Sequence, residues 1–281
     1  MSRKTRRDYT TQALAIRDAL AAILCGRFEW TGLPERLTTY QMERFISLWS
    51  ANGLAVGFED QTGGPMILPG YPSGEFDIYW LPRSYTVTGA NYDRVIDSDA
   101  CVPFYATPAR VGMLPLFEST ADILTTILSV MQTNLRQQRN PYVFAGSKPE
   151  IETFREALRK REEGDEVLAV TQSGLSTVET AKRFFPIKPE FLGAELMEHY
   201  TQVLNRFLTE CGIDNVPILK RERVSTAESA SNNQLIVYYR DAATRIREDA
   251  ADRFNRMFGF SLNVTWKGGQ IHDEVSIAVR S

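Results

Sequence analysis

The sequence predicts an α+β protein in which helical segments flank an inserted segment of short β-strands. Apolar residues recur at helical spacing in residues 10–53 and again in residues 118–140. Between these ranges, in residues 54–117, Gly and Pro separate short apolar or alternating runs. Short strands between turn signals indicate a small antiparallel sheet or barrel, so we expect a β insert between helices.

The chain begins with a basic segment, residues 1–9, that contains Arg3, Lys4, Arg6 and Arg7. Because this segment is polar throughout, we expect an arm without fixed structure. It has neither a following apolar core nor a cleavage site, so it is not a secretory signal. Two readings of the cations stay open: a flexible arm that binds phosphates by charge, and a tail that only aids solubility.

Two helices are expected in residues 10–53. The first begins at Thr10 and stops at Gly26. The second covers residues 39–51, and its inward residues are Met42, Phe45, Ile46 and Trp49.

The β insert, residues 54–117, is expected to contain six strands. Each is a short apolar or alternating run next to Gly or Pro. The expected strands are 54–59, 66–68, 76–81, 85–88, 94–96 and 101–106.

The helical pattern returns in residues 118–140, which predict a long amphipathic helix with Ser119 and Asp122 in capping positions. A compact α/β segment, residues 141–188, is expected next. Residues 189–217 then predict another long helix that starts at Pro189.

Residues 218–234 are polar and lack periodicity, so we expect a loop. The last segment, residues 235–281, predicts a helix to Phe258 that is capped by Gly259. Strands are expected over residues 261–266 and 274–279. The last helix has a face of mixed charge between residues 240 and 256, which suits either contacts between subunits or a solvated surface.

The overall composition is ordinary for a soluble protein. Apolar residues make up 43% and charged residues 24% of the 281 residues. The formal net charge is −3, from 32 Lys and Arg against 35 Asp and Glu, so any contact with nucleic acid must come from local basic patches. No stretch approaches the roughly 20 consecutive apolar residues that span a bilayer. These features point to the cytoplasm or to an assembly built there.

No motif indicates catalysis or a cofactor. The phosphate-binding loops of nucleotide enzymes and the nucleophile elbow of hydrolases are both missing. The two histidines, His199 and His272, lie in no metal-binding pattern. Asp97 and Asp99 are a possible magnesium pair, but a turn explains their spacing better. We therefore expect no enzyme activity, no metal and no cofactor.

The three cysteines are expected to be buried, inert thiols, because no two of them are close in sequence and all lie among apolar residues. They are Cys25, Cys101 and Cys211.

Several motifs, in order along nearly the whole chain, resemble the portal (upper collar, head–tail connector) family of phi-twenty-nine-like, Picovirinae-type podophages. In the first half they are Phe28-Glu29-Trp30-x-x-Leu33-Pro34, Val56-Gly57-Phe58, Leu114-Pro115-Leu116-Phe117 and Ile127-Leu128-Ser129-Val130 with Gln132. In the second half they are Phe207-Leu208 with Gly212-Ile213, the segment from Lys220 to Thr226, and Gly259-x-x-Leu262-Asn263-Val264.

The resemblance implies long stem helices, a β-barrel-like wing formed by the insert and a small α/β clip at residues 141–188, assembled as a homododecameric ring around double-stranded DNA. Lys182 aligns with one of the two channel lysines of the family, and Lys188 is the candidate for the other. The implied channel loop, residues 218–234, contributes the DNA-facing residues Lys220, Arg221, Arg223, Ser229, Asn232 and Asn233. The basic arm is implied to bind a packaging RNA or the packaging motor.

The implied function is packaging, retention and ejection of DNA at one capsid vertex of the virion, after assembly in the host cytoplasm. The implied partners are further copies of the chain, double-stranded DNA, the packaging ATPase, a packaging RNA, capsid and scaffolding proteins, and lower collar or tail proteins, with no membrane. Two other functions stay open: a monomeric nucleic-acid-binding adaptor, and an enzyme that uses carboxylates with a metal.

Overall fold

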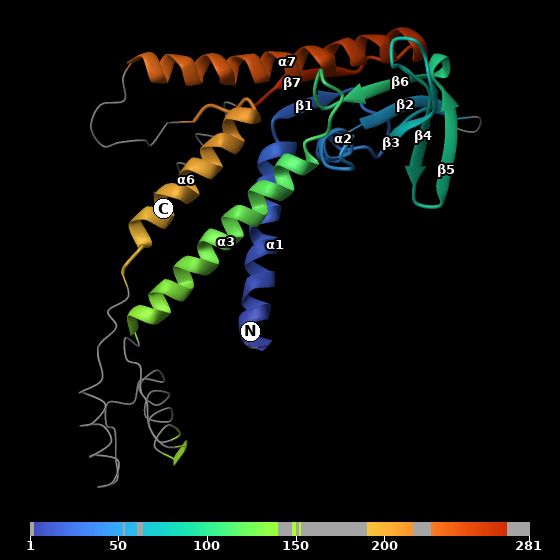
Figure 1. The fold of residues 1–281 in the computed structure, drawn as a ribbon. Helices are drawn as coiled ribbons and strands as arrows, with labels where there is room; N and C mark the ends of the chain where they lie inside the picture. Colours follow the sequence, from blue (N-terminus) through green and yellow to red (C-terminus); the bar gives the residue numbers. More distant parts are fainter. Residues whose placement is uncertain are drawn as a thin grey trace. The chain divides into compact units, whose positions relative to one another are not determined.

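The computed structural model describes residues 3–52, 54–60, 64–139, 148–149, 152, 190–215 and 226–268 (Figure 1). The chain forms two compact units. The larger combines Met1–Thr126 with His199–Ser281, and the smaller is Ile127–Glu198. The expected clip, residues 141–188, lies almost entirely outside the described residues, and so does the expected strand over residues 274–279.

The first helix, α1, spans Arg3–Cys25. It stops where the sequence predicts, since Gly26 donates the last helical hydrogen bond to the carbonyl of Ala22. Its start differs from the prediction, because residues 3–9 belong to the helix and do not form an arm without fixed structure. Helical propensity continues through the Arg and Lys residues, which are good helix formers.

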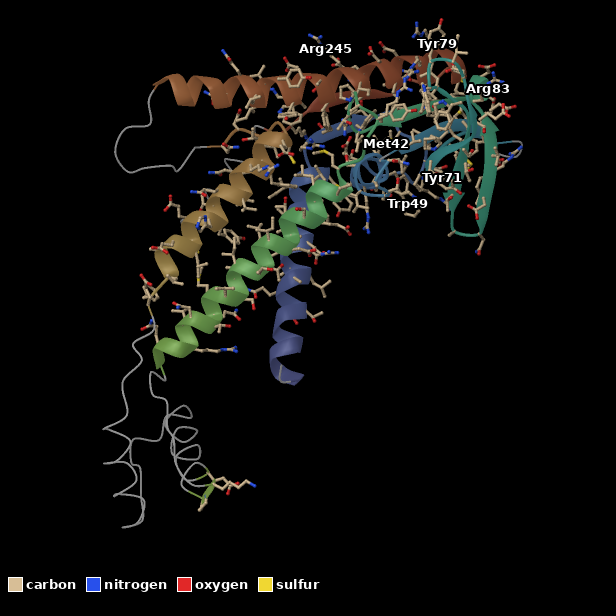
Figure 2. All side chains as sticks on the ribbon, in the orientation of Figure 1. Met42, Trp49, Tyr71, Tyr79, Arg83 and Arg245 are labelled. Atoms are coloured by element: carbon tan, nitrogen blue, oxygen red, sulfur yellow. The ribbon has the colours of Figure 1, made fainter. Side chains whose placement is uncertain are left out.

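Helix α2 spans Thr39–Ser47 and begins with a capping box, in which Thr38 and Gln41 each accept a hydrogen bond from the backbone of the other. Met42 and Ile46 are buried, as predicted. Trp49 was predicted to face inward, but the helix ends before it and its side chain is 45% exposed (Figure 2).

Five antiparallel strands form the insert: β2 (Leu54–Asp60), β3 (Gly64–Phe76), β4 (Pro82–Gly89), β5 (Tyr92–Asp97) and β6 (Cys101–Tyr105). Their order is β5-β4-β3-β2-β6. The prediction of an antiparallel sheet is therefore confirmed. However, β5 and β6 are the two edges, so these strands make an open sheet and not a closed barrel.

The long strand β3 changes partners halfway along its length. Its first half pairs with β2, with Val56 opposite Leu68, and its second half pairs with β4, with Gly70 opposite Val87. A Cβ atom on Gly70 would lie 2.6 Å from the carbonyl oxygen of Thr86, so only glycine permits this close approach. The strand predicted over residues 76–81 is wrong: β3 ends at Phe76, and a turn leads into β4.

The sheet has its own apolar core. Leu54, Val56 and Phe58 of β2 pack with residues of β4 and β6, and Ile246 packs against them from outside the sheet. Inside this core the hydroxyls of Tyr85 and Tyr105 share a hydrogen bond of 2.9 Å. Burial, together with that bond, raises the pKa of Tyr85 above its ordinary range.

Helix α7, Thr226–Phe258, is the longest element described. Figure 1 shows it (orange to red) lying along strand β7, Asn263–Trp266, which pairs antiparallel with β1, Phe28–Thr31. The chain reverses after Phe258 through Gly259, whose φ of 68° suits glycine, as predicted. The side chain of Asn255 fixes the reversal by bonding both the N–H and the carbonyl of Leu262 at 2.7 Å.

The predicted loop over residues 218–234 is only partly a loop. Residues 226–234 belong to α7, because their Ala, Glu and Gln residues support a helix despite the lack of apolar periodicity. Residues 216–225 lie outside the described residues.

The remaining long helices are α3, Leu114–Arg139, and α6, Gly193–Glu210. Helix α3 begins five residues before Ser119, so Ser119 and Asp122 are not its caps. Helix α6 begins at Gly193, after the non-helical residues 190–192, so the predicted start at Pro189 is wrong. Within the smaller unit, the side chain of Asn134 on α3 fixes the segment just before α6. Its amide N–H donates to the carbonyl of Glu190, and its amide oxygen accepts from the N–H of Leu192.

Candidate functional surfaces

A buried ion pair fixes α7 to the larger unit. Arg247 donates two hydrogen bonds of 2.9 Å, from Nε and Nη2, to the two carboxylate oxygens of Glu43 on α2. Both side chains are fully buried. Two parallel bonds of this kind give the strongest and most directional form of an Arg–carboxylate pair.

The remaining polar atoms of this pair are also satisfied. The Nη1 of Arg247 donates to the carbonyls of Ala106 and Ala243, and the indole N–H of Trp30 donates to Glu43 at 2.9 Å. The guanidinium lies 4.2 Å from the centre of the Phe28 ring. The hydrogen bonds of this pair therefore connect α7, α2, β1 and the end of β6, and they leave neither charged group without a partner. The sequence pattern assigns Arg247 to a face of mixed charge that is expected to be solvated or to contact other subunits, but its side chain is buried within the larger unit.

A second buried guanidinium, that of Arg27, lies 5.6 Å from the centre of the Phe28 ring. It donates to the carbonyl of Leu24, the carbonyl of Cys211 and the sulfur of Met113. Burial lowers the pKa of Arg27 from its ordinary value, and the nearby Arg247 cation lowers it as well. Arg27 thus binds the end of α1 to the segment that follows α6.

The sheet and α7 meet at a close contact. A Cβ atom on Gly57 would lie 2.5 Å from the ring of Phe254 and 3.1 Å from that of Phe104. Phe254 is fully buried and lies 5.9 Å from Phe104, centre to centre. Glycine at position 57 is therefore needed for the ring of Phe254 to reach the strand.

A groove of about 990 Å³ lies between the sheet and the exposed side of α7. Its apolar lining includes Tyr85, Tyr105 and Ile246. Its charged lining comprises the arginines Arg83, Arg110, Arg245, Arg253 and Arg256 and the carboxylates Asp77, Asp99, Asp249 and Asp252. Figure 2 labels Arg83 at the sheet and Arg245 on α7. Because four carboxylates accompany five arginines, the groove does not form the dominant positive patch that nucleic acid requires.

The turn between β3 and β4 exposes a cluster of large apolar side chains. Ile78 is 87%, Tyr79 76% and Trp80 81% exposed, and Phe76 and Leu81 are also exposed. The strand predicted over residues 76–81 did not indicate this cluster. The order Asp–x–x–Trp–Leu–Pro, with Asp77 and Pro82 around the apolar residues, is the signal in the sequence that favours a turn.

Exposed apolar residues also occur along the long helices. On α3 they include Ile123, Val130 and Leu135, and on α7 they include Leu235 and Tyr238. Of the described helices, α3 alone is long and apolar enough over Leu114–Arg136 to cross a membrane by length and composition, with 28% of that window buried. Such a stretch is not expected from the sequence, because Ser and Thr interrupt the apolar residues. Near the start of α3, Glu118 and Asp122 form ion pairs with Arg17 of α1, at 3.9 and 3.4 Å.

The structure places only some of the predicted site residues. Arg3, Lys4, Arg6 and Arg7 belong to the first turns of α1, and Ser229, Asn232 and Asn233 belong to the first turns of α7. Asn233 is exposed. The cations predicted for the channel, Lys182, Lys188, Lys220, Arg221 and Arg223, lie outside the described residues.

Among the described residues, those considered for catalysis do not assemble into a site, and His272 lies outside the described part of the chain. Asp97 precedes the 3₁₀ turn Ser98–Ala100 without a capping bond from its side chain. In the described part of the chain, no three His, Cys, Asp or Glu residues gather in a group able to hold a metal ion. Cys25, Cys101 and Cys211 are buried free thiols, as predicted.

The comparisons with known proteins cover almost the whole chain. A family model described as Phage Connector (GP10) matches residues 4–270. A solved structure described as the portal and tail of native bacteriophage P68 aligns with 93% of this chain and 90% of that chain, at 11% sequence identity and a TM-score of 0.41. That structural likeness is too distant to carry an argument, whereas the family match spans both units.

Proposed function

The chain belongs to the phage connector family, and on that premise we propose that its copies assemble into a homododecameric ring that surrounds double-stranded DNA at one capsid vertex. Its function is that of a phage portal or connector protein, and the match over residues 4–270 carries this conclusion. The phi-twenty-nine-like subtype is part of the proposal and rests on the sequence motifs described above.

Exposed apolar surface supports assembly of several copies. A soluble monomer rarely leaves large contiguous apolar patches in water, because their burial is favourable by roughly 25 cal/mol per Å². Three such exposed apolar side chains are Ile123 and Val130 of α3 and Tyr238 of α7, which contact with a neighbouring copy would bury. In a closed ring every copy covers the same patch of its neighbour, so one pair of complementary faces satisfies all copies.

We assign parts of the ring by element. Helices α3 and α6 form the stem, the five-stranded sheet forms the wing, and residues 141–188 form the clip at the narrow end. The buried pair Arg247–Glu43 supports this division, because it holds α7 rigidly on the part of the chain that also supports the sheet. A firm α7 then gives its polar first turns, residues 226–234, a fixed place at the channel.

The channel requires weak contact with DNA. A wall that bound phosphates tightly would stall the duplex, so a nearly neutral protein with sparse basic rings suits passage. We propose Lys182, Lys188, Lys220, Arg221 and Arg223 as these rings, with Ser229, Asn232 and Asn233 as polar contacts. Repetition around the ring turns each single cation into a band of charge.

The cations at the start of α1, Arg3, Lys4, Arg6 and Arg7, are proposed to bind a packaging RNA or the packaging motor. Four cations within two helical turns give a local positive charge that the net charge of −3 conceals. The remaining proposed partners are the packaging ATPase, capsid and scaffolding proteins, and lower collar or tail proteins. Assembly is proposed to occur in the host cytoplasm, and the ring then becomes part of the virion.

The function is tested by disrupting the gene in the phage and supplying the protein from a plasmid. Without the protein, purified particles should contain no nuclease-protected DNA, and the wild-type plasmid should restore it. Protected DNA at the normal level in particles that lack the protein would contradict the portal function. The purified protein is expected to have no ATPase activity of its own and still to restore packaging, because a connector guides DNA that a separate motor moves.

A further inference from the structure

We propose that the β3–β4 turn, residues 76–81, is an anchor that inserts into an apolar pocket of a protein outside the ring. Several copies of this pocket each receive the turn of one copy of the chain. This inference rests on the proposed ring. It assigns a partner surface to residues that neither the family match nor the predicted channel explains.

The turn has a defined shape. The carboxylate of Asp77 accepts hydrogen bonds of 2.8 Å from the backbone N–H groups of Tyr79 and Leu81. The backbone N–H of Asp77 donates to Leu81, and that of Trp80 donates to Asp77. These bonds close the turn on itself, so the apolar side chains project from a framework that is already ordered.

Backbone strain supports a functional reason for this shape. Trp80 has a φ of 59°, in the left-handed region that bulky residues rarely adopt. Holding a bulky residue there is unfavourable, and such strain is concentrated at binding and switching sites. The Trp80 ring lies 6.1 Å from that of the exposed Phe76, and Trp80 and Tyr79 are 81% and 76% exposed, so neither side chain packs into the core of the protein.

The size of the exposed surface decides between two occupants. Aromatic side chains cover about 150–250 Å² each, so Phe76, Tyr79 and Trp80 together offer about 400 Å² at their observed exposures, and the smaller side chains of Ile78 and Leu81 add to this area. A stable interface needs about 800 Å² on each partner, and permanent subunit contacts need more. One turn by itself is therefore too small to hold two copies of the chain together, and the exposed apolar residues of α3 and α7 are better suited to that contact.

A weak contact becomes strong when it is repeated. Simultaneous engagement of linked sites raises the overall affinity by about 10²–10⁴ without any new kind of contact. A ring presents one turn per copy, so the occupant is a protein that meets several turns at once. Trp and Tyr are the residues that most often act as such anchors.

Charge distinguishes a protein pocket from a lipid surface. Glu75 and Asp77 lie at the start of the turn, and Arg83, the cation that follows it, lies 3.9 Å from Glu75. Anionic membranes attract clusters of Lys and Arg, which this turn does not have. The occupant is therefore a pocket on a protein.

The test places a photo-crosslinking residue in the assembled particle. Tyr79 is replaced by benzoylphenylalanine in the full chain, particles are purified and irradiated, and the crosslinked chains are identified by mass spectrometry. The expected product joins this chain to a different protein. The matched control replaces Val95, an exposed apolar residue of β5, and should give no such product. Crosslinks only between copies of this chain, or none from position 79, would overturn the proposal.

A second measurement tests the need for the side chains. The variant Tyr79→Ser/Trp80→Ser should form rings of normal mass but enter particles at least tenfold less than wild type, while Val95→Ser enters normally. Normal entry of the double variant, or loss of its ring, would reject the external partner. Flotation of wild-type rings with phosphatidylcholine–phosphatidylglycerol vesicles that needs Trp80 would instead indicate a membrane. If wild-type protein is itself absent from particles, the proposed function fails before the anchor is tested.

Discussion

Arg247 on α7 and Glu43 on α2, 204 residues apart in the sequence, meet as a fully buried ion pair with two hydrogen bonds of 2.9 Å. The pair is surrounded by Phe28, Trp30 and Ser47, so water does not screen it. This arrangement makes the position of α7 depend on one carboxylate in a short helix near the N-terminus.

Removing either partner should strongly destabilise the larger unit. Arg247→Met leaves Glu43 charged and buried, and Glu43→Gln does the same to Arg247, so each should lower the free energy of unfolding by about 3–5 kcal/mol. Urea unfolding at a fixed protein concentration measures this. Arg253→Met, at an exposed site on the same helix, is the control and should change stability by less than about 0.5 kcal/mol.

A loss below about 1 kcal/mol in both single variants would contradict the role of the pair. The double variant Glu43→Met/Arg247→Met should be more stable than either single variant, because no uncompensated charge remains.

Gly57→Ala should destabilise the contact between the sheet and α7. The new methyl group would lie 2.5 Å from the Phe254 ring, so the ring must move, and overpacking of this kind costs about 1–3 kcal/mol. Thermal unfolding measures the loss. Gly89→Ala is the control, since its nearest neighbour would lie at 3.4 Å. Replacing the ring by a smaller side chain, as in Phe254→Leu, should reduce the loss of stability caused by Gly57→Ala. Equal stability of Gly57→Ala and Gly89→Ala would contradict the contact.

Much of the fold follows from local sequence patterns. Gly26 and Gly259 end helices where predicted, and the apolar runs of β2 and β6 become strands, because turn chemistry and strand preference act over a few residues. Other features are not marked by apolar spacing. Helix α2 ends before Trp49, where the carbonyl of Ser47 accepts a hydrogen bond from the N–H of Met113, a residue distant in the sequence. The continuation of α7 through residues 226–234 follows the helical propensity of its Ala, Glu and Gln residues, although this segment lacks apolar periodicity.

The burial of Arg247 is indicated by the spacing of its neighbours in the sequence, although their charges suggest exposure. Its charged neighbours Arg245 and Glu248 suggest a solvated face, yet Ala243, Arg247, Ala250 and Phe254 recur at helical spacing. All four are buried, so the stripe and not the residue type marks the inner face of α7. Its partner Glu43 could not be found from sequence, since the pairing depends on how α2 and α7 pack.

The three buried thiols predict a loss of stability at alkaline pH. Burial raises the pKa of Cys25, Cys101 and Cys211 from 9.0 to about 12. Above about pH 9 the unfolded chain releases these protons while the folded chain keeps them, so stability is full below pH 9 and falls as pH rises toward 12. Each thiol contributes up to about 1.4 kcal/mol per pH unit.

Urea unfolding between pH 8 and pH 10.5 measures this slope, and Cys101→Ala should make it shallower. Below pH 9 the native thiols should react with Ellman's reagent only as fast as the protein opens. Rapid reaction of all three thiols in the native state would contradict their burial.

The basic start of α1 is expected to act in packaging and not in ring assembly. Replacing Arg3, Lys4, Arg6 and Arg7 together by Ala removes four cations and keeps helical propensity. Nuclease-protected DNA per particle should fall at least tenfold, while the mass of the ring stays the same. Replacing Arg44 and Arg94 by Ala controls for loss of surface charge elsewhere. Unchanged packaging would remove the role assigned to these cations.

Native mass spectrometry with negative-stain class averages measures whether the chain forms a ring. The expected particle has about twelve times the 31.8 kDa chain mass and a central hole. Val130→Glu, which places a charge on the exposed apolar face of α3, should shift that particle toward monomers. A wild-type protein that stays monomeric or dimeric at micromolar concentration would contradict the ring and would favour a nucleic-acid-binding adaptor.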